Sequence, residues 1–184
     1  MDSATLPVSL PIGGPLRQAR FLERPNRFVV RARLGNGRVA VAHLADPGRL
    51  KELLVPGRRV WLRHTRSPLR ATEWSAVLVE SPDSSGLVSV DTQLPNRLVG
   101  RALEASALEE LRGWRLAGRE HTVGHSRFDF LLHRRRGGRG PRRMALEVKS
   151  VTLVENRVGL FPDAVTARGA RHVRELAALR TGGD

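Results

Sequence analysis

Short runs of hydrophobic residues separated by turn residues fill the first half of the chain. Such runs near Arg17–Glu23, Phe28–Leu34, which is rich in Val and Phe, and Arg38–His43 predict three strands. Gly35-Asn36-Gly37 joins the last two runs, and these residues favour the backbone of a tight hairpin turn. We therefore expect a small antiparallel sheet at the start of the protein.

A short helix is predicted after these strands. Asp46 supplies a capping carboxylate, and Pro47 suits the first turn because no N–H donor is needed there. The leucines of the stretch 50–54 then share one helical face, and Pro56-Gly57 ends the helix. The pattern thus predicts one or two helical turns between the third and fourth strands.

Two more strands, near Arg58–Arg63 and Glu73–Glu80, follow this helix. Three strands, one helix and two strands is the order of an OB-fold, a small β-barrel that often binds oligonucleotides. Many other small barrels share this order, so the pattern alone is suggestive. We predict an N-terminal extension over residues 1–15 and an OB-fold-like barrel over residues 16–82.

The spacing of hydrophobic residues changes beyond Ser81–Gly86, a stretch of Ser, Pro, Asp and Gly that is typical of a linker. Helical spacing begins behind Pro95-Asn96. The face predicted for this helix consists of Leu98, Ala102, Ala105 and Leu108. The elements expected here are a helix over Arg97–Trp114, strands near His121–Leu132 and Met144–Val154, and an amphipathic helix over Thr166–Arg180. We predict a second, α/β domain over residues 87–184.

The charge balance is strongly basic. The chain carries 32 basic and 18 acidic residues, a net charge of +14, and the halves on either side of residue 90 share the excess equally. Such a surface attracts polyanions, and nucleic acid binds it by releasing counterions. The alternative is a basic surface that is merely solvated, because an excess of Arg over Lys also reflects a GC-rich genome.

Composition excludes several classes of protein. The chain contains no cysteine, so disulfides and thiolate zinc sites are excluded. No apolar run approaches the roughly 18 residues of a membrane span, and the N-terminus lacks the regions of a signal peptide. We therefore expect a cytoplasmic protein without a membrane partner. Trp61, Trp74 and Trp114 are expected in core packing, although a Trp on a barrel surface can stack on bases.

Two predicted strands bring charged residues to one surface. Asp129 alternates with phenylalanines on its strand, and Glu147 and Lys149 alternate with Leu146 and Val148 on theirs. If the apolar faces pack together on the core, Asp129, Glu147 and Lys149 converge. Two carboxylates beside a lysine suit a hard divalent cation and an activated water. The alternative is a solvated strand face on which Glu147 pairs with Lys149.

Longer motifs are more specific than this pattern. They are Asp91–Val99, Ser126–Leu132, Glu147–Glu155 and Phe161–Thr166, followed by Arg168-Gly169 and His172. In these motifs, and in their order, the chain resembles the sugar fermentation stimulation protein A family from about residue 17 onwards. The resemblance implies an OB-fold joined to a PD-(D/E)xK nuclease-like domain, DNA binding, and a proposed regulatory role in maltose metabolism.

The nuclease signature of that family falls on Asp129, Glu147 and Lys149 of this chain. The resemblance implies that Asp129, Glu147 and the main-chain carbonyl of Val148 hold Mg²⁺ or Mn²⁺. Lys149 would then orient or deprotonate the attacking water. Glu104, on the predicted helix, is a further candidate metal ligand or a solvated helix residue.

Arginines near this site are expected to contact DNA. The loop His133–Arg143, rich in Arg and Gly, either grips phosphates or is a solvated hairpin loop. The expected nucleic-acid contacts are Arg127, Arg134, Arg135, Arg136, Arg168 and His172. The last two, with Asp163, either line the same cleft or cap and pack the final helix.

The chain departs from the family pattern in two places. His43–Arg49 differs from the Pro-Asn-Thr-Gly-Ser sequence of well-known relatives, which leaves the role of this segment open. Relatives also continue past the last helix with a hydrophobic strand. The nuclease-like domain is therefore expected to lack its C-terminal part here.

Two functions from different classes follow. The first is a Mg²⁺-dependent phosphodiesterase that acts on DNA. The second is a non-catalytic, sequence-tolerant DNA-binding regulator of sugar (maltose) metabolism with a vestigial nuclease site. A third, weaker hypothesis is an RNA-binding OB protein. The sequence leaves open whether the DNA is single- or double-stranded and whether the protein forms a homo-oligomer.

Overall fold

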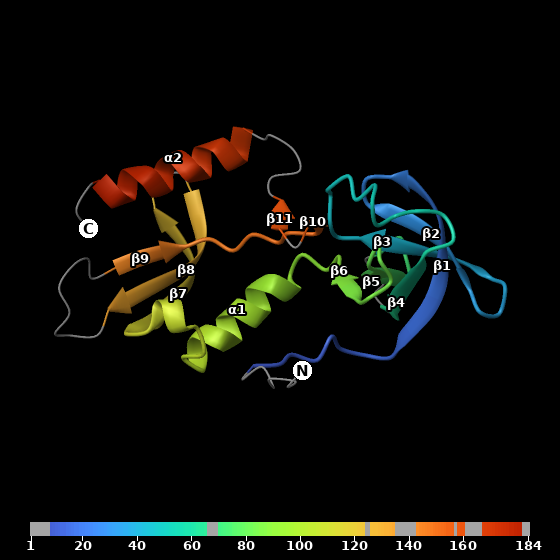
Figure 1. Ribbon diagram of the computed structural model, residues 1–184, viewed down its shortest axis with the longest axis horizontal. Helices are drawn as coiled ribbons and strands as arrows, with labels where there is room; N and C mark the ends of the chain where they lie inside the picture. The colour runs from blue at the N-terminus through green and yellow to red at the C-terminus, as the bar shows by residue number, and fades with distance from the viewer. Residues whose placement is uncertain are drawn as a thin grey trace. The chain divides into compact units, whose positions relative to one another are not determined.

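The computed structural model describes residues 8–65, 70–123, 126–134, 143–156, 158–160 and 167–181, the last of these without the side chains of 167–169, 172 and 179–181. The chain divides into two compact units, each of which is described by itself (Figure 1). The barrel unit comprises residues 12–94 and 150–164. The second unit comprises residues 1–11, 95–149 and 165–184. The segment 150–164 therefore groups with the barrel, although it lies far along the chain.

The barrel unit is built on six strands. They are β1 (Leu16–Asn26), β2 (Val29–Leu34), β3 (Val39–Leu44), β4 (Arg59–His64), β5 (Trp74–Glu80) and β6 (Leu87–Ser89). Their order in the sheet is β3-β2-β1-β4-β5-β6, and a parallel pairing of β3 with β5 closes the first five into a barrel. The predicted OB-fold is confirmed.

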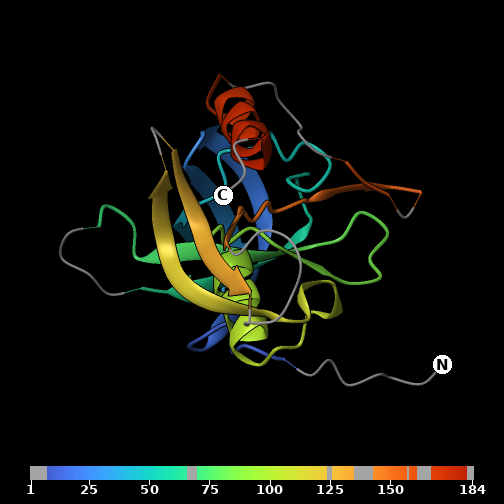
Figure 2. The same cartoon turned by 90° about the vertical axis from the view of Figure 1, so that its left-hand side faces the viewer.

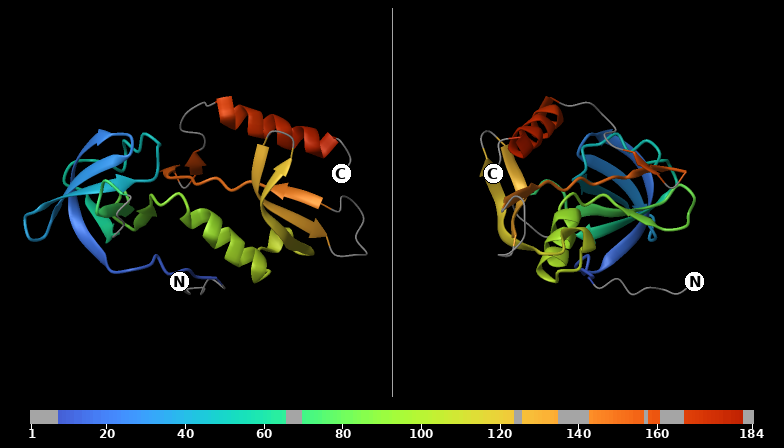
Figure 3. Two further views of the ribbon diagram at one scale, coloured as in Figure 1. Left: turned by 180° about the vertical axis from the view of Figure 1, so that it is seen from behind. Right: turned by 60° about the vertical axis from the view of Figure 1, so that its left-hand side comes forward.

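Alternation of side chains explains why these strands enclose a core. The strands turn small and branched apolar residues inwards and arginines outwards, so the sheet has one dry face. Shifts in the register of β1 with β2, after Phe21 and after Glu23, bend the long β1 strand. Both views of Figure 3 show β1, in blue, curving round the side of the barrel.

The prediction of a helix after Asp46 is wrong. The carboxylate of Asp46 accepts the N–H of Gly48 at 2.8 Å, which makes a local turn in place of a helical cap. Leu50 then has a φ of 49°, in the left-handed region that ends a right-handed helix. Only one turn follows, in which the N–H of Leu54 donates to the carbonyl of Leu50 at 2.8 Å.

The second unit combines helices with a three-stranded antiparallel sheet, in the order β7-β8-β9. Its elements are α1 (Leu94–Glu104), the short 3-10 helix η1 (Glu109–Leu111), β7 (Trp114–Val123), β8 (Ser126–Arg134), β9 (Arg143–Leu146) and α2 (Ala167–Thr181). Phe130 and Leu132 of β8 pack with Leu103 and Val99 of α1. Figure 2 shows the long, twisted β7 and β8 strands of this sheet.

Three expected elements of this half have different bounds. The helix expected to reach Trp114 ends at Glu104, and its buried face contains Ala102 and Leu103, whereas Leu98 and Ala105 are exposed. The strand expected near His121–Leu132 is part of a hairpin, β7 and β8. The strand expected over Met144–Val154 stops at Leu146 and resumes as β10 (Leu153–Glu155), which pairs with β11 (Val158–Leu160) in the barrel unit. The final helix lies within one residue of its predicted bounds.

Candidate functional site

Asp129 is the centre of a polar network in the second unit. It lies half-buried on β8 between Phe128 and Phe130, whose side chains are buried in the core. One carboxylate oxygen accepts the side-chain amide of Asn96 at 2.6 Å, and the other accepts the N–H of Val148 at 2.7 Å. Donors from α1 and from the segment after β9 therefore fix the orientation of this carboxylate.

Glu147 and Lys149 follow β9 directly and lie beside Asp129. The β8–β9 register ends at the pair of Phe130 with Leu146, so Glu147 and Lys149 lie just past the sheet, on either side of Val148, whose N–H binds Asp129. Lys149 donates to Glu147 through its Nζ atom. The Glu147 side chain is largely buried and that of Lys149 is exposed. The network thus holds two carboxylates and one ammonium group.

Glu104 does not join this network. Its carboxylate accepts the guanidinium of Arg119 at 2.8 Å, and about half of each side chain is exposed. The same guanidinium lies 5.2 Å from the centre of the Phe130 ring. Over the residues that the structure describes, no group of three or more His, Asp or Glu side chains comes together as a metal site.

The arginines predicted to contact DNA are only partly described. Arg127 is exposed on β8 and pairs with Glu120 at 3.4 Å. Arg134 lies over the ring of Trp114, 5.4 Å from its centre. The other predicted contacts, Arg135, Arg136, Arg168 and His172, fall outside the described residues or side chains, as does Asp163, which was expected in the cleft or at the final helix.

Sequence patterns missed the contribution of Asn96. An Asn beside a Pro at the start of a helix ordinarily indicates a capping role. In the folded unit its amide instead binds Asp129, which lies 33 positions further along the chain. No local signal distinguishes these two roles, because the partner is brought near only by the packing of α1 on β8.

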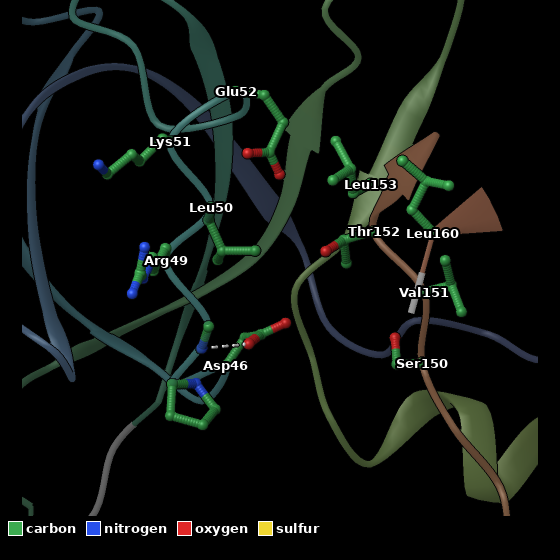
Figure 4. A pocket seen from close by; sticks show the side chains of 12 residues that line it. Asp46, Arg49, Leu50, Lys51, Glu52, Ser150, Val151, Thr152, Leu153 and Leu160 are labelled. Carbon is green, nitrogen blue, oxygen red and sulfur yellow. Dashed lines mark hydrogen bonds between the residues drawn. The ribbon is translucent and has the colours of Figure 1, made fainter. Parts of the chain in front are cut away.

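A cavity of about 310 Å³ lies in the barrel unit, between the turn that replaces the predicted helix and the segment that leads into β10. In Figure 4, Leu50 points towards Thr152 and Leu153, whereas Arg49 and Lys51 point to the other side. Asp46 and Glu52 add carboxylates and Ser150 and Thr152 add hydroxyls to the lining of this cavity.

Arg24 of β1 braces this turn from outside it. Its guanidinium donates to the main-chain carbonyls of Arg27 (2.6 Å), Asp46 (3.2 Å), Gly48 (2.6 Å) and Arg49 (2.9 Å). Burial lowers the pKa of Arg24 from its usual value, and the charge of Asp46 acts in the opposite direction. The turn is therefore shaped by its main chain as much as by its side chains.

Comparison with known families divides the chain in two. The SfsA N-terminal OB domain matches residues 22–90, and the sugar fermentation stimulation protein RE domain matches residues 93–184. Both matches follow the order predicted from the sequence. Within the described residues, no helix is both long and apolar enough to cross a membrane.

Individual relatives resemble the chain over most of its length. The sugar fermentation stimulation protein homologue of Shouchella clausii is 52% identical, over 90% of this chain and 69% of its own length. The homologue of Moorella thermoacetica is 49% identical, over 96% of this chain and 72% of its own length. The structure of Pyrococcus furiosus SfsA in complex with Ca²⁺ superposes with a TM-score of 0.79 and 32% identity, over 92% of this chain and 69% of that one. The chain therefore belongs to the sugar fermentation stimulation protein family.

Proposed function

We propose that this protein binds DNA and hydrolyses its phosphodiester bonds with the help of Mg²⁺ or Mn²⁺. The observation that carries the proposal is the network of the second unit, in which Asp129 binds the N–H of Val148 and the two residues that flank Val148, Glu147 and Lys149, bind each other. Two carboxylates and a lysine on one surface are the groups that metal-dependent phosphoryl chemistry uses.

The donor set fits a small, hard cation. Mg²⁺ prefers oxygen ligands, and it usually keeps several waters while binding one or two carboxylates and the phosphates of its substrate. Asp129, Glu147 and the carbonyl of Val148 would supply the protein oxygens. Once bound, the ion would polarise a phosphate oxygen and offset the negative charge that develops there. The Pyrococcus furiosus relative is described with Ca²⁺, which also prefers oxygen ligands.

The remaining groups of the network have distinct roles in this proposal. Asn96 and the N–H of Val148 keep the Asp129 carboxylate in one orientation, so little reorganisation is needed when a ligand arrives. Lys149 offsets the charge of Glu147 and, because it is exposed, can turn to donate to a phosphate oxygen or to orient a water.

Affinity for DNA is supported by the charge of the chain. The net charge of +14 is divided equally between the two halves, so both contribute to attraction of the phosphate backbone. Binding of this origin is sequence-tolerant and weakens as salt is added, because each phosphate contact releases counterions.

The proposal is tested by incubating labelled single- and double-stranded DNA with the full chain in Mg²⁺, Mn²⁺ or EDTA. We expect cleavage only with metal. Lys149→Ala should remove cleavage, and Lys51→Ala, which changes the only other lysine, should retain it. Calorimetry should show metal binding to wild type and to Lys149→Ala, and a loss of binding in Asp129→Asn. Wild-type protein that binds no divalent metal would rule out the enzymatic function.

A second function is favoured by one observation. Both oxygens of Asp129 already accept N–H donors, and Glu147 already binds Lys149, as in a network kept for structure. In this alternative the protein is a non-catalytic DNA-binding regulator of sugar metabolism. DNA binding without cleavage in any metal, and unaffected by Lys149→Ala, would favour it.

A further inference from the structure

Three arginines stand directly opposite one another on neighbouring strands of the barrel. The register pairs Arg20 of β1 with Arg33 of β2 on one side and with Arg59 of β4 on the other. The residues before and after Arg20 and the residue after Arg59 are buried, so alternation turns the three arginines to the outer surface. Like charges directly opposite destabilise a sheet. We call Arg20, Arg33 and Arg59 the arginine row.

Most of the positive charge in the arginine row is not offset by acids. Arg59 is paired with Glu80, to which its Nε donates at 2.9 Å. Arg20 donates to the carbonyl of Gly57 at 3.0 Å, which leaves its charge in place. Within the described part of the chain, the side chain of Arg33 makes no hydrogen bond or ion pair. An anion along the row would therefore relieve the repulsion between these arginines.

A groove begins where the arginine row ends. Val39 of β3, the register partner of Arg33, is 42% exposed and lines a groove of about 380 Å³ together with Val41, which is 44% exposed. The groove is also lined by His64 and Trp74, whose rings meet edge to face with their centres 4.9 Å apart. Arg38 and Glu73 add charged groups to the lining. A groove with exposed valines, an aromatic pair and these charges thus continues directly from a cationic row on the same unit.

We propose that this face of the barrel binds single-stranded nucleic acid, with phosphates along the arginine row and a base in the groove against Val39 and Trp74. This inference rests on the DNA binding proposed above and names the form of DNA and the surface. Single-strand binding proteins combine a cationic track with rings on which bases stack. In a duplex the bases are already paired and stacked, so only its phosphates are offered to such a face.

The first test measures binding of the full chain to a fluorescent oligothymidine and to a duplex of equal length, both in EDTA. The test protein is the double variant Arg20→Gln/Arg33→Gln. Its control is the double variant Arg112→Gln/Arg115→Gln, which changes two exposed arginines of the second unit and removes the same charge. The row variant should lose about tenfold or more in single-strand affinity. Its log–log salt slope should fall by about 0.7 for each phosphate contact removed. Equal losses in both double variants would overturn the proposal.

The second test addresses the groove without disturbing the core. Val39→Glu adds a charge at the groove, and Val55→Glu adds the same charge at a valine with 40% exposure elsewhere in the barrel unit. Loss of one base-stacking contact corresponds to about 5- to 150-fold in affinity. Val39→Glu should lie in this range for the single strand and change duplex binding no more than Val55→Glu does.

The outcomes separate this inference from the proposed function. Wild type that binds neither form of DNA would overturn both. Wild type that binds DNA, with row and groove variants indistinguishable from their controls, would overturn only the surface proposed here. A wild-type preference for the duplex would overturn the choice of a single-stranded partner.

Discussion

The barrel and the three-stranded sheet of the second unit bury their apolar side chains to different extents. The barrel closes on itself, and fourteen apolar residues of one cluster are buried inside it. Among the described residues of the second unit, the corresponding cluster has Leu103, Phe130 and Leu132 buried, and its other members are partly exposed. The comparison indicates that hydrophobic packing dominates the stability of the barrel, whereas the stability of the second unit depends more on polar contacts such as those of Asp129.

Truncating one core side chain in each unit tests most directly whether the two units differ in stability. Phe130→Ala removes a ring that is 1% exposed from a cluster with few buried members, at a cost of about 3–5 kcal/mol. We expect the amides of β7, β8 and β9 to lose protection in hydrogen exchange while those of the barrel keep it.

Leu62→Ala supplies the matched change in the barrel. It should cost about 2–5 kcal/mol and leave a folded barrel, because the closed sheet retains the rest of its cluster. If either substitution unfolds both units together in hydrogen exchange, the two units do not have separate stabilities and the comparison fails.

A smaller effect is expected from the polar network. Asp129→Ala leaves the N–H of Val148 and the amide of Asn96 without their acceptor, at about 1–3 kcal/mol in the second unit. Asp129→Asn keeps an oxygen acceptor and should cost less. Hydrogen exchange of the β8 amides distinguishes the two variants, and equal stabilities would mean that the network contributes little to folding.

The smallest effect concerns a turn of the barrel unit. Hydrogen bonds from the hydroxyls of Ser81 and Ser85 lower the pKa of Asp83 from 3.8 to about 2. Because the folded pKa lies below the unfolded one, this contribution is present above about pH 4 and is lost as the pH falls towards 2. Asp83→Asn should therefore lower the melting temperature more at pH 6 than at pH 3.

Ser81→Ala refines the prediction for this turn. Loss of one hydroxyl donor should raise the pKa of Asp83 towards its usual value, because that donor is the largest cause of the shift. Titration of the Asp83 carboxyl by NMR measures this directly. An unchanged pKa in the variant would assign the shift to Ser85 and to the main chain.

Local sequence patterns were sufficient to predict the strands of the barrel. They were insufficient where the conformation depends on an unusual backbone angle or on a residue far along the chain. Short apolar runs bounded by turn residues located β1 to β5, including β5, which is buried on both faces. The helix after Asp46 failed because Leu50 adopts a positive φ that no leucine pattern signals. The helix before Trp114 was predicted too long because Leu108, which lies beyond the end of α1 and just before the 3-10 helix η1, continues the apolar spacing and packs on the same cluster.

The candidate site was predictable to the same degree. Strand alternation and a family motif both select Asp129, Glu147 and Lys149, whose role in a site stays a prediction. Asn96 was not found, because its role depends on contact between α1 and β8. Register within a sheet follows from the sequence pattern more directly than the placement of a helix on that sheet.

The hydrogen bonds of Arg24 to the turn depend on main-chain atoms and not on the side chains of the turn. Its guanidinium binds carbonyl oxygens of the turn, and every amino acid supplies the same carbonyl. Substitutions at 47–49 therefore keep the acceptors that Arg24 uses, whereas a change at position 24 removes the donor of all these hydrogen bonds, and a change at 46 removes the carboxylate that binds the N–H of Gly48. The wall of the cavity beside the turn can therefore change its side chains at 47 and 49 while the carbonyl acceptors of Arg24 stay in place.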